Sequence, residues 1–168
     1  MPVAVAPQPP QIAPLDDVVR VVQVFASTPW PYPEAGIPDL VERLGWRLIS
    51  PPDAEFPEAD TSLPLQWATA DFMSLDGELN GILFRVTDVV DDEAPWRADF
   101  VNDAYVTTIR AISTALGKPD QRGRTPDSRY TYWELATGGR ITLYAFTSHL
   151  AIDVISAMYA DLDRSQTR

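Results

Sequence analysis

The chain has 168 residues, a net charge of −11 and no cysteine. This length suits one domain with a single core, and the lack of cysteine excludes disulfides, zinc–thiolate sites and thiol nucleophiles. Its longest apolar runs are far shorter than the roughly 20 residues that cross a bilayer, and prolines interrupt the N-terminal segment before an export signal can form. We therefore expect a cytoplasmic domain that packing alone holds together.

Helical periodicity and end signals predict four helices. The first covers residues 14–26, and the second begins at Ile37 or Pro38 and ends at Leu44, before Gly45. The third covers residues 95–116 and has the longest apolar stripe, and a short terminal helix covers residues 158–162.

Alternating or short apolar runs predict the strands, and turn residues separate them. Asp76-Gly77 is a favoured hairpin pair, and residues 51–64 and 117–128 are predicted as loops. Consecutive strands with short connections favour an α+β fold, with an antiparallel sheet of about five or six strands and helices on one face. The expected order is α-α-β-β-β-α-β-β-β-α, with strands at residues 46–49, 66–73, 81–89, 129–135, 140–147 and 149–155.

Residues 1–14 contain five prolines and little that can pack, which predicts a flexible tail. No shift in composition divides the remaining chain. Residues 15–164 are therefore expected to form a single α+β domain.

The excess negative charge is concentrated in the middle of the chain. Residues 53–93 hold eleven acids and one base, Arg85. A negative field repels nucleic acid and anionic lipid and attracts basic protein surfaces. The segment is either a protein interface or only a solubilising surface, and we expect no nucleic-acid or membrane partner.

No motif for catalysis or cofactor binding stands out. His149 is the only histidine; Ser148 beside it lacks a glycine elbow, and Asp153 lies about 13 Å away if the strand is extended. Residues 76–81 imitate half of a calcium loop, but Thr87 stands where a bidentate glutamate is needed. We therefore expect no enzyme activity, no cofactor and no metal.

Two segments carry a resemblance. One is Trp30-Pro31-Tyr32 with residues 37–46, and the other runs from helix 99–116 through Leu116-Gly117-Lys118-Pro119 to Tyr132-Trp133-Glu134-Leu135. Together they resemble a group of small uncharacterised actinobacterial proteins. Through that group, the chain is similar to immunity factors that neutralise secreted polymorphic toxins, including the inhibitor of a necrotizing NAD-degrading toxin.

The leading hypothesis is an immunity or inhibitor protein that docks its acidic segment over the active site of a toxin with a basic cleft. The alternatives are an acidic secretion chaperone, which would act as a dimer, and a small-molecule-binding domain. Nothing in the sequence decides between a monomer and a dimer. The predicted partner-binding residues are Glu55, Glu58, Asp60, Asp76, Glu78, Asp91, Asp92 and Trp96.

Overall fold

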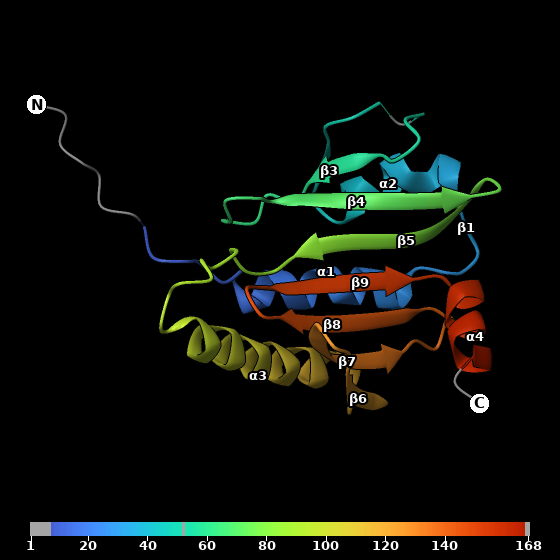
Figure 1. Ribbon diagram of the computed structural model, residues 1–168. Coiled ribbons are helices and arrows are strands. Elements are labelled where there is room, and N and C mark those ends of the chain that lie inside the picture. The colour runs from blue at the N-terminus through green and yellow to red at the C-terminus, as the bar shows by residue number, and fades with distance from the viewer. Residues whose placement is uncertain (1–7, 52, 167–168) are drawn as a thin grey trace, which may run out of the picture.

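A single antiparallel sheet organises the chain in the computed structural model, which describes residues 8–51 and 53–166 (Figure 1). The helices are α1 (Leu15–Ser27), α2 (Ile37–Arg43), α3 (Arg97–Leu116) and α4 (Ala157–Gln166), and a 3₁₀ turn covers Glu34–Gly36. The strands are β1 (Tyr32–Pro33), β2 (Arg47–Leu48), β3 (Glu58–Asp60), β4 (Thr69–Leu75), β5 (Glu78–Arg85), β6 (Gln121–Arg124), β7 (Ser128–Glu134), β8 (Arg140–Phe146) and β9 (Leu150–Ile155).

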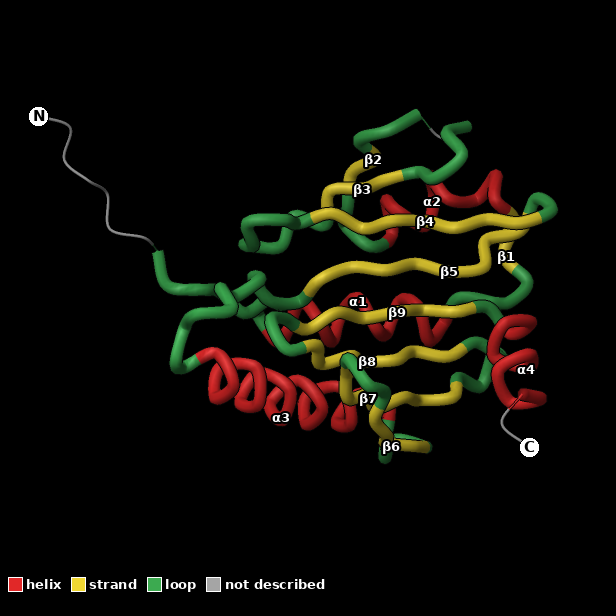
Figure 2. Tube along the Cα trace, viewed as in Figure 1, coloured by secondary structure: helices red, strands yellow, loops and turns green. Residues whose placement is uncertain are grey.

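The strands lie in the order β2-β3-β4-β5-β9-β8-β7-β6, and β1 pairs with the first two residues of β5. Helices α1, α2 and α3 lie against one face of this sheet, and α4 lies beyond the ends of β8 and β9 (Figures 1 and 2). None of the helices in the described part of the chain combines the length and apolarity that a membrane span requires.

The α+β class and the antiparallel sheet are confirmed, but the expected number of strands is wrong. The sheet has nine strands, because β1, β3 and β6 form outside the six predicted strands, and β3 and β6 lie in segments predicted as loops. These strands are two to four residues long. Such runs are too short to show alternation, and they take their conformation from the longer strands beside them.

The core lies between the helices and the sheet. The rings of Phe25, Trp46, Phe72 and Phe84 pack on one another with centroids 5.1–6.4 Å apart. Each of the three phenylalanines is at most 2% exposed. Burying a side chain of this kind contributes roughly 1.5–3 kcal/mol, so this cluster fixes how the first two helices sit on the sheet.

The β4–β5 hairpin is tighter than predicted. Asp76 and Gly77 have φ of 54° and 79° and form a two-residue turn, so the two strands extend to Leu75 and from Glu78. This conformation is the one that an Asp-Gly pair favours. The half-motif for calcium at residues 76–81 is therefore part of a hairpin.

The described part of the predicted tail includes an ordered segment. The backbone N–H of Ala13 donates to Val86 O at 2.7 Å, and Asp88 N–H donates to Gln11 O at 2.9 Å. The Asp88 carboxylate accepts N–H bonds from Gln11 and Gln66, both at 2.8 Å. Residues 11–13 thus belong to the domain, while residues 1–7 lie outside the described residues.

Candidate functional site

Within the described part of the chain, helices α1, α2 and α3 all lie on one face of the sheet, and only the end of α4 reaches the other. Along β9, Leu150, Ile152 and Val154 belong to the core on the helix side. Their neighbours Ala151, Asp153 and Ile155 therefore point to the opposite face, because successive side chains of a strand alternate. We call this second surface of the sheet the open face.

The strand register brings one row of side chains together across the open face. Paired residues on neighbouring strands lie about 5 Å apart, so the row spans about 30 Å. Three acidic or apolar side chains come from the β3–β5 side and three polar or aromatic ones from the β6–β8 side, with Asp153 between them. In order from β3 to β6, the row is Glu58, Asp71, Leu83, Asp153, Thr142, Tyr132 and Gln121.

The β3–β5 side of the open face combines acids with exposed apolar side chains. Glu58 and Asp71 lie directly opposite each other, an arrangement of like charges that disfavours the folded state. Met73 and Leu83 are 46% and 42% exposed. Trp67 is 59% exposed, with the Arg85 guanidinium 5.4 Å from its ring centroid. This half thus resembles the surface of a protein interface more than ordinary solvated surface.

Asp153 occupies the middle of the open face. No hydrogen bond or ion pair to its carboxylate is found among the described residues. Its cross-strand neighbours are Leu83 and Thr142, neither of which carries a charge. Burial raises the pKa of Asp153 from 3.8 to about 6. The fold thus holds a partly buried carboxyl group that no described residue pairs with.

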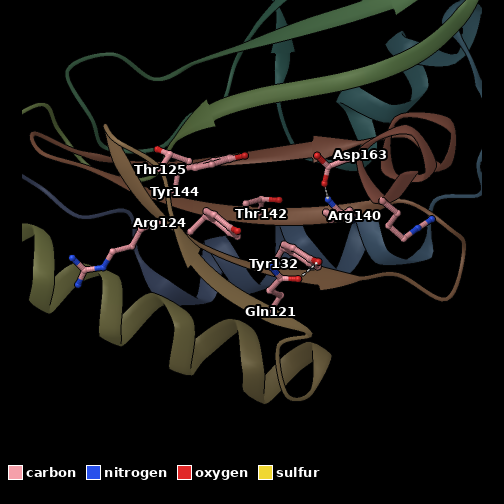
Figure 3. Close-up of a pocket in the computed structure, with 10 residues that line it drawn as sticks. Gln121, Arg124, Thr125, Tyr132, Arg140, Thr142, Tyr144 and Asp163 are labelled. Carbon is pink, nitrogen blue, oxygen red and sulfur yellow. Dashed lines mark hydrogen bonds and ion pairs between the residues drawn. The ribbon is translucent and has the colours of Figure 1, made fainter. Parts of the chain in front are cut away.

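A pocket of about 590 Å³ lies on the β6–β8 side of the open face (Figure 3). Strands β6, β7 and β8 form its floor, and the end of α4 forms one wall. Its polar and aromatic side chains come from segments far apart in the sequence. We call it the tyrosine pocket; it is lined by Gln121, Arg124, Thr125, Tyr130, Tyr132, Arg140, Thr142, Tyr144, Asp163 and Arg164.

A continuous series of rings runs from the tyrosine pocket along the open face. Tyr130 stacks on Tyr132 with centroids 6.3 Å apart, and it contacts Tyr144 at the same distance. Tyr144 stacks on Phe146, whose ring lies 4.9 Å from that of His149. Of these pairs, Tyr130–Tyr144 joins β7 to β8, and a cross-strand aromatic pair stabilises a sheet by roughly 0.2–1 kcal/mol. The strands that carry the rings hold them as a preordered surface.

Gly123 allows the β6–β7 hairpin to close beside Tyr130. A Cβ at position 123 would lie 2.3 Å from the Tyr130 hydroxyl oxygen and 2.4 Å from Cζ. A side chain there would displace the tyrosine, because real Cβ atoms do not approach other atoms so closely.

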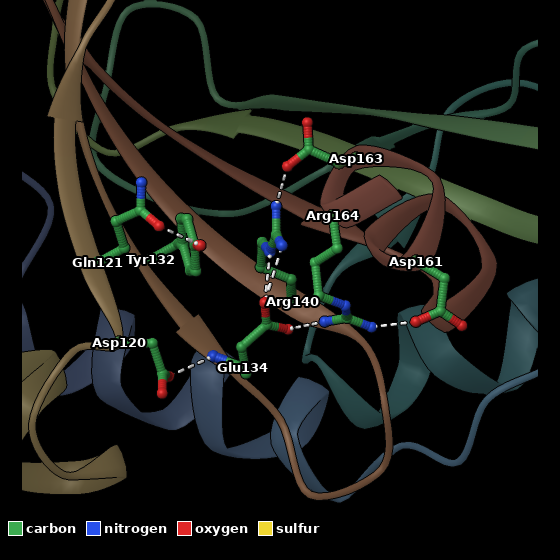
Figure 4. Close-up of polar contacts among 8 residues, drawn as sticks. All are labelled: Asp120, Gln121, Tyr132, Glu134, Arg140, Asp161, Asp163 and Arg164. Carbon is green, nitrogen blue, oxygen red and sulfur yellow. Dashed lines mark hydrogen bonds and ion pairs between the residues drawn. The ribbon is translucent and has the colours of Figure 1, made fainter. Parts of the chain in front are cut away.

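An ionic network forms the wall of the tyrosine pocket next to α4 (Figure 4). Arg140 is 4% exposed, donates to Glu134 at 2.8 Å and also pairs with Asp163. Its guanidinium lies 4.1 Å from the ring centroid of Tyr132. Arg164 bridges Glu134 and Asp161. Three carboxylates therefore neutralise two guanidiniums, and the wall carries no excess positive charge.

Two hydroxyl-bearing residues in the pocket have distinctive surroundings. Thr142 is only 5% exposed, and no hydrogen bond of its hydroxyl is found among the described residues. Burial raises the pKa of the Tyr144 hydroxyl, and the negative charges of Asp153 and Asp163 raise it further against the effect of Arg140. The potential around Tyr144 is thus negative.

The structure divides the predicted partner-binding residues. Glu58 and Asp60 lie on β3, beside the buried Ala59, and both point to the open face. Asp60 forms an ion pair with Arg47 at 3.2 Å. Glu55 is exposed in the loop before β3.

The other five lie at opposite ends of the long strands. Asp76 and Glu78 belong to the β4–β5 turn. Asp91, Asp92 and Trp96 precede α3, at the other end of the sheet (Figure 1). Asp91 accepts the Glu93 N–H within a turn, and Asp92 pairs with Arg97. The eight residues do not form one patch, and their role in binding stays a prediction.

His149 is not part of a catalytic arrangement in the described residues. It is half-buried, and its Nδ1 lies 3.0 Å from Ser148 Oγ. Burial lowers its pKa, and the nearby Arg85 lowers it further. No carboxylate among the described residues hydrogen-bonds to the ring, so the histidine has no group that would orient it as a general base.

Comparison with known proteins yields a family but no characterised relative. No curated protein and no solved structure is significantly similar to the chain. A family model described as a family of unknown function, DUF6301, matches residues 16–156. That range covers all nine strands of the sheet but not α4, and on this evidence the chain belongs to the DUF6301 family.

Proposed function

We propose that this chain is a non-catalytic protein-binding domain, an inhibitor of the immunity type, that binds a basic partner protein through its open face. The observation that carries the proposal is the asymmetry of the sheet. Helices α1, α2 and α3 lie on one face of the nine-stranded sheet, while the other face, which only the end of α4 reaches, presents exposed Met73, Leu83 and Trp67 beside tyrosines and paired arginines. Aromatic residues, methionine and arginine are enriched at protein interfaces, and tyrosine, tryptophan and arginine also at their hot spots.

The charge of the chain supports a basic partner. The net charge is −11, and the open face contains Glu58, Asp60, Asp71 and Asp153 against Arg47 and Arg85. Complementary charges steer association and raise its rate, and salt weakens this effect. The exposed apolar side chains would then supply the contacts that slow dissociation.

The resemblance to immunity factors supports a toxin as this partner. In this proposal, the broad, preformed face covers the toxin's basic cleft and excludes its substrate. A rigid sheet suits this role, because a preordered surface loses little conformational entropy on binding.

The test begins with the partner. The protein that co-purifies with the wild-type chain at low salt is co-expressed in a host whose growth it arrests. Wild-type chain should restore growth and Leu83→Asp should not, because it places a charge at the centre of the apolar contacts. Val106→Asp is the matched control, since Val106 is 50% exposed on α3, away from the open face.

Three outcomes contradict the proposal. Growth rescue by Leu83→Asp would remove the open face from the interface. Loss of rescue with Val106→Asp alone would place the interface on the helix side. Binding without rescue, to an unfolded segment of an exported protein, would favour the secretion chaperone instead.

A further inference from the structure

We infer that the open face holds a site for a cationic side chain of the partner, an arginine or lysine, between the carboxylate of Asp153 and the ring of Tyr144. This inference rests on the proposed function and concerns the contact at the centre of the open face, between a carboxylate of this chain and a cation of the partner. The site lies where the acidic half of the open face meets the tyrosine pocket.

The geometry places one negative charge, one ring and one hydroxyl together. Asp153 is paired with Thr142 across β8 and β9, and Tyr144 is paired with Ala151 in the next row. Asp153 and Tyr144 therefore belong to neighbouring positions on the same face. Figure 3 shows Thr142 and Tyr144 as parts of one pocket lining. A guanidinium here would have a carboxylate to pair with, a ring face to stack on and a hydroxyl that accepts a hydrogen bond.

Two polar groups point to a missing ligand. The Thr142 hydroxyl has no hydrogen-bond partner among the described residues although the residue is 95% buried, being 5% exposed. The Asp153 carboxylate likewise has no such partner within the described part of the chain. Neither group belongs to the buried side-chain atoms that lack a partner, so both still reach solvent. An accessible carboxylate beside an accessible hydroxyl offers a ligand two acceptors that no described residue uses.

The charges around Asp153 favour a cation over an anion. Arg140 on β8 is neutralised by Glu134 and Asp163, and Arg85 on β5 is held over the Trp67 ring. Asp71 on β4 adds a negative charge from the same row. On α4, Asp163 adds to the negative potential at Tyr144, as Asp153 itself does. These carboxylates would repel an anion. A cation would instead pair with the Asp153 carboxylate and so compensate for the water that burial removes from it.

The experiment uses a small probe on the full-length protein. N-acetyl-arginine amide is titrated into ¹⁵N-labelled wild-type chain, with N-acetyl-citrulline amide as its neutral isostere. The arginine probe should give saturable shifts at Asp153, Thr142 and Tyr144 with a Kd on the order of 10 mM, and the citrulline probe should not. Shifts that do not saturate, that map elsewhere or that are equal for both probes would overturn the inference.

Variants separate the site from the general acidity of the face. Asp153→Asn should weaken the arginine probe about fivefold, and Asp71→Asn, in the same row but without a ring beside it, by less than about twofold. Tyr144→Leu should also weaken it, because the stacking surface is lost. Equal effects of Asp153→Asn and Asp71→Asn would mean that only the net charge matters.

The pH profile provides a second readout. Probe binding should weaken as the pH falls through about 6, since protonation of Asp153 removes the charge. His149 is the other group nearby that gains charge on acidification, so His149→Gln should keep the same profile. A profile that is flat in the wild type, or abolished by His149→Gln, would contradict a role for Asp153.

The growth-rescue assay separates this inference from the proposed function. If Asp153→Asn rescues growth as well as wild type while Leu83→Asp does not, the open face binds the partner but Asp153 does not anchor it. If neither variant affects rescue, the proposed function itself fails.

Discussion

The two faces of the sheet are built from the same strands but differ in the burial and the polarity of their side chains. On β5, Ile82 and Phe84 are at most 2% exposed and pack into the core, while Leu83 between them is 42% exposed. On β9, the covered face holds only aliphatic side chains, while the open face holds Asp153, which no described residue pairs with. The side chains on the covered face are explained by their contribution to stability. Those on the open face that weaken the fold require a functional reason.

The largest expected effect tests the covered face. Phe84→Ala should lower the free energy of unfolding by about 3–5 kcal/mol, because it opens a cavity next to Phe25 and Trp46. Leu83→Ala, one residue away on the open face, should cost less than about 1 kcal/mol. Urea unfolding of both variants measures the contrast, and similar losses would mean that the open face is also a structural core.

A smaller loss of stability is expected on removal of Asp88, a carboxylate whose surroundings are the opposite of those of Asp153. Asp88 is 5% exposed and accepts two backbone N–H bonds, whereas Asp153 accepts none from the described residues. Asp88→Ala should therefore destabilise the fold by about 2–4 kcal/mol, since two donors lose a charged acceptor. Faster amide exchange at Gln11 and Gln66 should accompany the loss, and unchanged exchange there would contradict this role.

Asp153→Asn should raise the stability of the fold, whereas Asp88→Ala should lower it. The pKa of Asp153 is raised to about 6 in the folded state, so the folded chain binds this proton more tightly than the unfolded chain. The resulting stability is present below about pH 4 and is lost as the pH rises through about 6, a difference of up to roughly 3 kcal/mol. Asparagine avoids this loss, and the variant should be more stable than wild type above pH 6.

Unfolding curves of wild type and Asp153→Asn between pH 4 and 8 measure this difference. The difference should grow from about pH 4 to about pH 6 and level off at higher pH. A constant difference at all pH values would show that the carboxyl group has an ordinary pKa and that its burial carries no cost.

Much of the fold is readable from sequence where the pattern is long. The stripe of α3 and the apolar runs that became β7, β8 and β9 each span six residues or more, and their predicted bounds are close to those found. Strands β1, β3 and β6 are too short to carry a pattern. Their conformation is set by pairing with distant neighbours, which local sequence does not encode.

The candidate site was harder to predict than the fold, because charge along the chain does not specify a face. The acidic run at 53–93 is split by the hairpins, so only part of it reaches the open face. The better signal was alternation within the predicted strands: Tyr130 with Tyr132, and Thr142 with Tyr144, recur at every second residue. Since helices cover only one face, these positions had to form the uncovered one.

The position of β9 gives the molecule a particular order of assembly. Strands β2–β5 and β6–β9 each form a series of adjacent hairpins, and the two series meet only where β5 pairs with β9, about seventy residues apart in the chain. Contacts of such separation form late, because a long loop must close first. Leu83 and Asp153 lie on opposite sides of this seam. A chain still emerging from the ribosome therefore carries two half-surfaces, and the complete open face exists only after β9 is synthesised.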